Sequence, residues 1–360
     1  MRYGAWAPYM HWAKVHDKAT HDLTGSNLLP CQLEDLPGAK DVLELWGPND
    51  EGYAPLIEAI AGYYDTSADR VCTAGGCSGA NFLAIAALVR HRDEILVERP
   101  GYDPHVGAAL LLGATVRRFE RVFEDGYALD PERVAAGVTD RTRLIVLTNT
   151  HNPSGVLATR EALEAVGSIA ANVGARVLVD EVYLDTLVDG SAPPASSMGP
   201  AFISTSSLTK AYGLSGLRGG WAIAEPDVVE AMRRVRDVVD AVGSFPSDRL
   251  ATLAFERLDT LADRARSILV PNMSLLIAFV DARDELEWVR PEGGAVGFPR
   301  VRGLDDCGGF VERLQSDYGV GVVPGAFFEA PAHFRVAVGG SREALQSGLA
   351  ALGEGLNSLT

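Results

Sequence analysis

The sequence predicts an α/β protein in which helices sandwich a mostly parallel sheet, together with a smaller α+β domain. Short apolar strands alternate with helical stretches as far as about residue 225, which is typical of a parallel sheet. Beyond Pro226, long helical patterns replace this alternation, and short strands return only near the C-terminus. We expect an N-terminal arm (1–40) that joins the small domain, a large domain (41–265) and a small C-terminal domain (266–360).

The composition excludes several classes of protein. With 360 residues, 47% hydrophobic and 22% charged, the chain has the make-up of a globular protein. A net charge of −16 argues against nucleic acid or an anionic membrane surface as the main partner. Four scattered cysteines and the lack of a long apolar run favour a reduced, cytoplasmic protein without a signal peptide or membrane span.

The N-terminal arm carries an aromatic residue at every third position from Tyr3 to Trp12. This spacing drifts around a helix, and Pro8 interrupts the run, so we expect an arm that packs on another surface, such as a partner subunit. His11, His16 and His21 recur every five residues, which spreads them around a helix. We therefore expect no metal site there.

Apolar periodicity, together with turn residues at the ends of each segment, predicts the helices and strands of the rest of the chain. Pro55 suits the first position of a helix that places Leu56, Ile60 and Tyr64 on one face. Pro271 is expected to kink or restart a long C-terminal helix. We predict strands over 70–73, 94–97, 115–119, 144–148, 176–179, 202–204, 288–290, 296–298 and 334–338, and helices over 55–64, 80–90, 106–112, 160–172, 226–242, 247–283, 305–317 and 342–355.

Polar and aromatic residues follow successive predicted strands. In open parallel sheets, ligands bind beyond the carboxyl ends of the strands. Each such residue alone can be a helix cap, a turn or a core-edge aromatic, but together they predict a binding site. The residues at these ends are Ser78, Tyr102, Asn152, Asp180, Tyr183 and Lys210.

Lys210 is the only lysine beyond Lys40, and it lies among hydroxyls and glycines eight residues before Arg218. Hydroxyls, small residues and an arginine suit a phosphate group. A lysine beside them can form a Schiff base with a phosphorylated aldehyde.

Four motifs follow one another in the chain: Pro100-Gly101-Tyr102, Asn152-Pro153-Ser154-Gly155, Asp180-Glu181-Val182-Tyr183, and Ser207-Leu208-Thr209-Lys210 with Gly213, Gly216, Arg218 and Gly220 after it. In this order they resemble the motifs of the fold-type I pyridoxal-phosphate enzymes, specifically the class I/II aminotransferase group. Val323-Pro324-Gly325 and Phe334-Arg335-Val336 are similar to the closing motifs of that group, and the resemblance spans about residues 45 to 340.

The resemblance implies pyridoxal 5′-phosphate as the cofactor and assigns a role to each motif residue. Lys210 is implied to form the Schiff base and to carry a proton, and Asp180 to keep the pyridine nitrogen protonated. Asn152 and Tyr183 are implied to bind the phenolic oxygen of the ring, and Tyr102 to stack on the ring. The catalytic residues implied are Lys210, Asp180 and Tyr183; the phosphate ligands Cys77, Ser78, Ser207 and Arg218; and the substrate ligands Arg335 for the α-carboxylate, Asn152 and Gly25.

The resemblance also implies a homodimer with its sites at the subunit interface. Many members place a tyrosine before the turn at Gly52-Tyr53, where it reaches the phosphate of the neighbouring subunit, and Trp46 stands there in this chain. An indole donates one hydrogen bond and cannot accept one. Gly219 stands where the lysine motif usually has an apolar residue.

The activity expected first is transfer of an amino group between an α-amino acid and a 2-oxo acid. The same scaffold supports a lyase, a decarboxylase or a cyclase, for example a C–S β-lyase or a biosynthetic amino-acid-modifying enzyme. A nucleotide-binding oxidoreductase is a weaker alternative, because the glycines near Lys210 lack the Gly-x-Gly-x-x-Gly spacing. A non-catalytic regulator is also weaker, because Lys210, Asp180 and Arg218 are all present.

Overall fold

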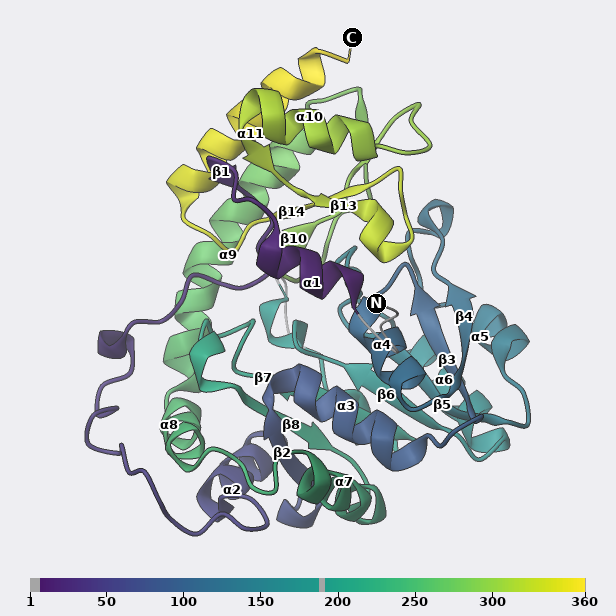
Figure 1. The fold of residues 1–360 in the computed structure, drawn as a ribbon, viewed down its shortest axis with the longest axis vertical. Helices are drawn as coiled ribbons and strands as arrows, with labels where there is room; N and C mark the ends of the chain where they lie inside the picture. The colour runs from purple at the N-terminus through teal and green to yellow at the C-terminus, as the bar shows by residue number, and fades with distance from the viewer. Residues whose placement is uncertain (1–6, 188–191, 360) are drawn as a thin grey trace.

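The computed structural model describes residues 7–187 and 192–359. Within these ranges, the large sheet has seven strands in the order β2-β8-β7-β6-β5-β3-β4 (Figure 1). Neighbouring strands from β7 to β4 run parallel, whereas β8 is antiparallel to both β2 and β7. The strands are β2 (Val71–Gly75), β3 (Glu94–Arg99), β4 (Thr115–Glu120), β5 (Thr142–Thr148), β6 (Arg176–Asp180), β7 (Phe202–Ser207) and β8 (Gly219–Ile223).

Helices cover both faces of this sheet because its central strands are apolar on both sides. On one face, Leu144 and Leu178 pack with residues of α3 and α7, such as Leu83 and Met232. The neighbouring positions, which point to the opposite face, pack against α5 and α6. The helices are α2 (Ala54–Tyr63), α3 (Gly76–Leu88), α4 (Asp103–Leu111), α5 (Pro131–Gly137), α6 (Arg160–Asn172) and α7 (Pro226–Val239).

A second core is built by the C-terminal part together with residues near the N-terminus. β1 (His21–Asp22) pairs in parallel with β12 (Val320–Gly321), and α1 (Pro8–Val15) lies between this part and the large sheet (Figure 1). These observations confirm the predicted fold class. The remaining elements are α8 (Phe245–Phe255), α9 (Leu258–Asp281), β9 (Leu286–Glu287), β10 (Val296–Gly297), β11 (Arg300–Val301), α10 (Gly308–Tyr318), β13 (Val323–Pro324), β14 (Phe334–Ala337) and α11 (Arg342–Asn357).

Several predicted elements are wrong in detail. The long helix expected over 247–283 is two helices that separate at residues 256–257, while Pro271 lies inside α9 without ending it. The strand expected at 288–290 lies instead at Leu286–Glu287. The arm contains a helix that begins at Pro8, since proline is well tolerated at the first helical position. Because α9 continues through residue 265, the division into domains at that position stays a prediction.

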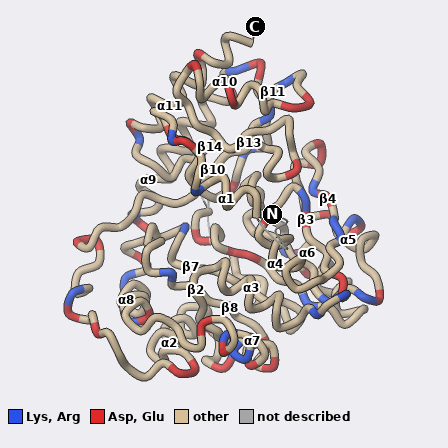
Figure 2. Tube along the Cα trace, viewed as in Figure 1, with Lys and Arg blue, Asp and Glu red and all other residues tan. Residues whose placement is uncertain are grey.

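Charged residues of both signs are interspersed along the trace (Figure 2). In the part of the chain that the structure describes, none of the helices combines the length and apolarity needed to span a bilayer.

Candidate active site

All eleven predicted site residues line one cavity of about 340 Å³. The cavity lies beyond the carboxyl ends of β5, β6 and β7, where Thr148, Asp180 and Ser207 end their strands. Residues from both ends of the chain complete its wall, namely α1, residues 24–27 and Arg335 of β14. The eleven residues are Gly25, Cys77, Ser78, Tyr102, Asn152, Asp180, Tyr183, Ser207, Lys210, Arg218 and Arg335.

Asp180 is buried and is held by three side chains from neighbouring helices. Its Oδ2 accepts a hydrogen bond from Asn81 at 2.7 Å and lies 3.4 Å from Nε2 of His105, while its Oδ1 lies 3.2 Å from Sγ of Cys77. Burial raises the pKa of Asp180, but its contacts with His105, Asn81 and Cys77 outweigh burial and lower the pKa below the ordinary value. The carboxylate is therefore kept ionised at the base of the cavity.

Lys210 extends into the same cavity from the loop after β7. Its Nζ lies 2.7 Å from Oγ of Ser26 and 2.6 Å from Oδ1 of Asn27. Burial, aided by the positive charges of Arg335 and Arg218, lowers the pKa of Lys210 to about 7. A large fraction of the amine is thus unprotonated near neutral pH, which is the form that attacks a carbonyl group.

The N-terminus of α3 and Arg218 form a cradle for an anion. Ser78 lies in the first turn of α3, where backbone N–H groups have no helical partner, and Nη2 of Arg218 lies 3.1 Å from the carbonyl oxygen of Gly75. Gly76 has a φ of +81°, and a Cβ there would clash with the Arg218 guanidinium. A Cβ on Gly220 would clash with the Gly76 backbone, so both glycines allow the cradle to form.

Arg335 is buried, with 1% of its surface exposed. Its Nη1 donates to Oδ1 of Asn152 at 3.3 Å, and its Nη2 donates to the hydroxyl of Tyr9. The Arg335 Nε, also buried, has no hydrogen-bond partner among the described residues. Since no described carboxylate pairs with Arg335, the guanidinium is available to a carboxylate ligand.

Two tyrosines, Tyr102 and Tyr183, line the cavity and contact residues near the N-terminus. The hydroxyl of Tyr183 donates to the carbonyl oxygen of Ser26 at 3.0 Å, and the hydroxyl of Tyr102 lies 3.3 Å from Sδ of Met10. Burial raises the pKa of both phenols, which keeps them protonated.

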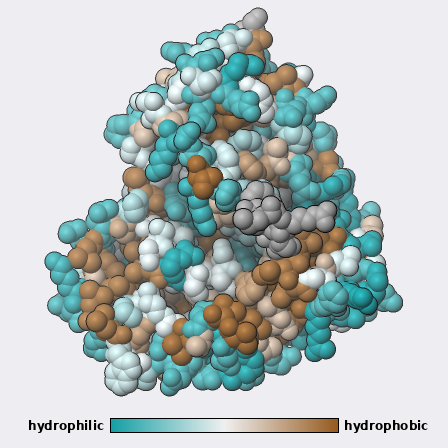
Figure 3. All heavy atoms as spheres, in the orientation of Figure 1, coloured by the Kyte–Doolittle hydropathy of each residue, from teal (hydrophilic) through white to brown (hydrophobic). Residues whose placement is uncertain are grey.

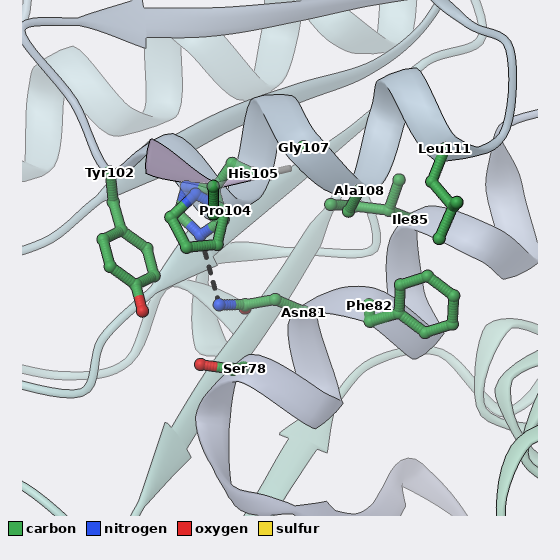
Figure 4. Close-up of a pocket in the computed structure, with 11 residues that line it drawn as sticks. Ser78, Asn81, Phe82, Ile85, Tyr102, Pro104, His105, Gly107, Ala108 and Leu111 are labelled. Carbon is green, nitrogen blue, oxygen red and sulfur yellow. Dashed lines mark hydrogen bonds between the residues drawn. The ribbon is translucent and has the colours of Figure 1, made fainter. Parts of the chain in front are cut away.

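Several residues that complete the site were not predicted from the sequence. Asn81 lies one helical turn after Cys77, so the 3.6-residue period of α3 could have placed it on the same face as Cys77. His105 lies three residues after Tyr102, and Figure 4 shows its hydrogen bond with Asn81 beside Ser78. These two side chains border a second hollow, of about 300 Å³, whose apolar lining includes Phe82, Ile85 and Leu111. Ser26 and Asn27 gave no local signal, and Tyr9 gave only the aromatic spacing of the arm.

The residues in the cavity fit a phosphorylated pyridine aldehyde. An ionised, buried carboxylate faces the cavity from one side, a lysine with a lowered pKa extends into it, and an anion cradle lies at the start of α3. The statistical model of the family "Aminotransferase class I and II" matches residues 34–352.

The chain belongs to the class I and II aminotransferase family. As a member of this family, it is an enzyme that depends on pyridoxal 5′-phosphate, as predicted.

The chain is similar in sequence to one named protein and in structure to two solved proteins. Capreomycidine synthase of Streptomyces vinaceus is 34% identical over 291 residues, which cover 80% of this chain and 75% of that protein. A crystal structure of a pyridoxal-phosphate-dependent aminotransferase from Streptococcus suis 89-1591 has a TM-score of 0.92 and 26% identity, with 100% and 98% of the two chains covered. The pyridoxal-phosphate-dependent cyclase OrfR has a TM-score of 0.89 and 26% identity, with 100% and 99% covered.

Proposed function

We propose that this protein is an aminotransferase that moves an amino group between an α-amino acid and a 2-oxo acid. The observation that carries the proposal is the position of Lys210 in one cavity with Asp180 and Arg335. A substrate that is bound through its carboxylate at Arg335 would have its amino group and Cα directed toward the lysine-linked cofactor.

Asp180 and Lys210 would act on the cofactor from different sides. The bound cofactor supplies an electron sink that stabilises negative charge at the substrate Cα. Asp180 would pair with the protonated pyridine nitrogen, a role that requires an ionised carboxylate, and the lowered pKa of Asp180 supports it. The unprotonated amine of Lys210 would accept the proton from the substrate Cα, as its lowered pKa favours.

The other cavity residues would bind and orient the two molecules. Ser78, Ser207 and Arg218, with the backbone of Cys77, would hold the phosphate at the N-terminus of α3. The Cys77 side chain itself lies against Asp180.

The remaining side chains would hold the ring and the substrate. Asn152 and Tyr183 would bind the phenolic oxygen of the ring, and Tyr102 would cover the ring. Arg335, Asn152 and Gly25 would contact the substrate.

A cyclase is the second candidate, favoured by the similarity to OrfR and to capreomycidine synthase. Both activities need the Cα proton removed by a lysine, so Lys210, Asp180 and Arg335 serve either one. They differ in the fate of the amino group, which a transferase leaves on the cofactor and a cyclase keeps on its product.

A half-reaction screen separates the two candidates. Single amino acids are added to the cofactor-loaded enzyme without a 2-oxo acid, and the visible spectrum and products are followed. A transferase loses its visible band and yields one equivalent of 2-oxo acid. A cyclase regains the band and yields a product that keeps its amino group, and this result would overturn the proposed transfer.

We further infer that the enzyme is a cytoplasmic homodimer with its sites near the interface. Leu45 and Trp46 leave 91% and 86% of their surfaces exposed in the single chain, and Val238 leaves 87%. Apolar side chains also gather over α3 and α4, beside the cofactor site (Figure 3). Such exposed apolar area is typical of a protein interface. The four cysteines are all free, which supports a reducing compartment.

A further inference from the structure

Tyr9 and Arg335 are in direct contact although 326 positions separate them in the sequence. The Arg335 guanidinium donates a hydrogen bond to the Tyr9 hydroxyl and lies 4.9 Å from the centre of the Tyr9 ring. The same guanidinium also lies 4.9 Å from the centre of the Phe328 ring. Two aromatic rings thus restrict the orientation of the cation, and Tyr9 itself is only 5% exposed.

The Tyr9 hydroxyl can still donate a hydrogen bond after it accepts one from Arg335. A phenolic hydroxyl that accepts a bond from Nη2 still carries its own proton. The only acceptor that Arg335 uses besides Tyr9, among the described residues, is Oδ1 of Asn152. Tyr9 can therefore donate to a carboxylate oxygen that the guanidinium binds, and a carboxylate accepts several such bonds.

Helix α1 is fixed by contacts that hold Tyr9 at this position. The backbone N–H of Tyr9 donates to Oδ2 of Asp103 at 2.8 Å, and the next residue, Met10, contacts the Tyr102 hydroxyl. The Trp12 ring of α1 lies 5.2 Å from the ring of Phe327, in the C-terminal part of the chain. The helix thus bridges the cofactor side and the C-terminal side of the cavity, and Tyr9 reaches Arg335 only while α1 is docked.

We propose that Tyr9 completes the α-carboxylate site by donating its hydroxyl hydrogen to the carboxylate that Arg335 holds, so that a bound carboxylate stabilises the docked position of α1. This inference rests on the proposed function, in which Arg335 binds the substrate carboxylate. It assigns Tyr9 as a substrate-binding residue and α1 as a part of the site that responds to the ligand.

A pair of small amines tests the assignment on the cofactor-loaded enzyme. 2-Aminoisobutyrate has no Cα hydrogen, so it can replace Lys210 on the cofactor without transamination. Its counterpart is tert-butylamine, which also lacks this hydrogen and has a methyl group in place of the carboxylate. The dissociation constant of each is measured from the change in visible absorbance. Tyr9→Phe keeps the ring and removes only the hydroxyl, while Tyr63→Phe on α2 is the matched control.

We expect Tyr9→Phe to raise the dissociation constant of 2-aminoisobutyrate by about 10-fold or more, as the loss of a hydrogen bond to a charged group predicts, and to change that of tert-butylamine by less than about 2-fold. Tyr63→Phe should change neither constant. Equal effects of Tyr9→Phe on both amines, or no effect on 2-aminoisobutyrate, would overturn the proposal.

Hydrogen–deuterium exchange of residues 9–15 provides a readout that does not depend on the spectrum. 2-Aminoisobutyrate should slow this exchange several-fold in the wild-type holoenzyme and much less in Tyr9→Phe, whereas tert-butylamine should slow it in neither. If both proteins are protected equally, α1 does not sense the carboxylate through Tyr9. Failure of the proposed function is a separate outcome, because the wild-type enzyme would then yield no 2-oxo acid in the half-reaction screen.

Discussion

Asn81 donates a hydrogen bond to Oδ2 of Asp180 at 2.7 Å, and its own Oδ1 accepts one from Thr205 at 2.5 Å. One side chain on α3 thereby connects the ends of β6 and β7 beneath the cofactor site. Since all three residues are buried, the amide orients the carboxylate in a region where bulk water does not compete.

Replacement of Asn81 by alanine should lower kcat/KM by about 10- to 100-fold, the range expected for losing a hydrogen bond to a buried charge. The pKa of Asp180 should rise, because Asn81 helps to lower it. Steady-state kinetics over a range of pH would then show the acid limb moved to higher pH. Asn172→Ala, at the exposed end of α6, is the control, and an unchanged acid limb in Asn81→Ala would refute this role.

The rate at which the apoprotein combines with pyridoxal phosphate should rise with pH around a midpoint of about 7, the lowered pKa of Lys210. Only the unprotonated amine attacks the aldehyde, so the rate should level off about one pH unit above the midpoint. Stopped-flow absorbance would measure it. A midpoint near 10, the ordinary value for lysine, would show that the cavity does not lower the pKa.

The same shift affects the stability of the apoprotein. In the unfolded chain Lys210 titrates near the ordinary pKa of about 10.4, so the unfolded state binds the proton more tightly than the folded state does. The contribution of Lys210 to the free energy of unfolding should therefore be fully present above about pH 10 and be lost as the pH falls toward about 7. Lys210→Met should remove this part of the pH dependence, as urea unfolding at several pH values would show.

Gly220→Ala should destabilise the protein and weaken cofactor binding, because the added Cβ would clash with the Gly76 backbone beneath the anion cradle. We expect a loss of about 1–3 kcal/mol in the free energy of unfolding, as for other overpacked sites, measured by urea denaturation. Gly216→Ala is the matched control from the same segment, since a Cβ there meets no atom within 4 Å. Equal losses in the two variants would contradict the close approach of Gly220 and Gly76.

Trp46→Glu should convert the proposed dimer to monomers, since it places a charge in the apolar area that the proposed interface would cover. Trp46→Phe keeps an apolar ring and should preserve the dimer. Sedimentation velocity would measure both. If Trp46→Glu stays dimeric, the exposed loop does not belong to the interface.

The alternation of strands and helices predicted the large sheet, and the polar residues after successive strands predicted a site at its edge, because parallel strands bring their carboxyl ends together. Asp180 and Asn152 could be placed beside Lys210 on this ground alone. β8 was missed because Gly219 and Gly220 look like loop residues, whereas in the fold they let the strand pass close to Gly76.

The residues around Arg335 could not be predicted from local sequence. Tyr9 reaches it from the opposite end of the chain, and the only signal, a three-residue aromatic spacing, suggested an arm on another surface. α1 instead packs on its own chain, against Phe327 and Phe328. Contacts of this kind depend on how the N-terminal and C-terminal segments fold together.

In the proposed function Lys210 carries the cofactor, and borohydride reduction followed by peptide mass spectrometry is the clearest test of this assignment. Wild-type protein loaded with pyridoxal phosphate should absorb in the visible, lose that band on reduction, and carry one pyridoxyl-phosphate group on Lys210. Lys210→Ala should show neither the band nor the modification. A wild-type protein that shows no visible band, or a modification on another lysine, would contradict the account.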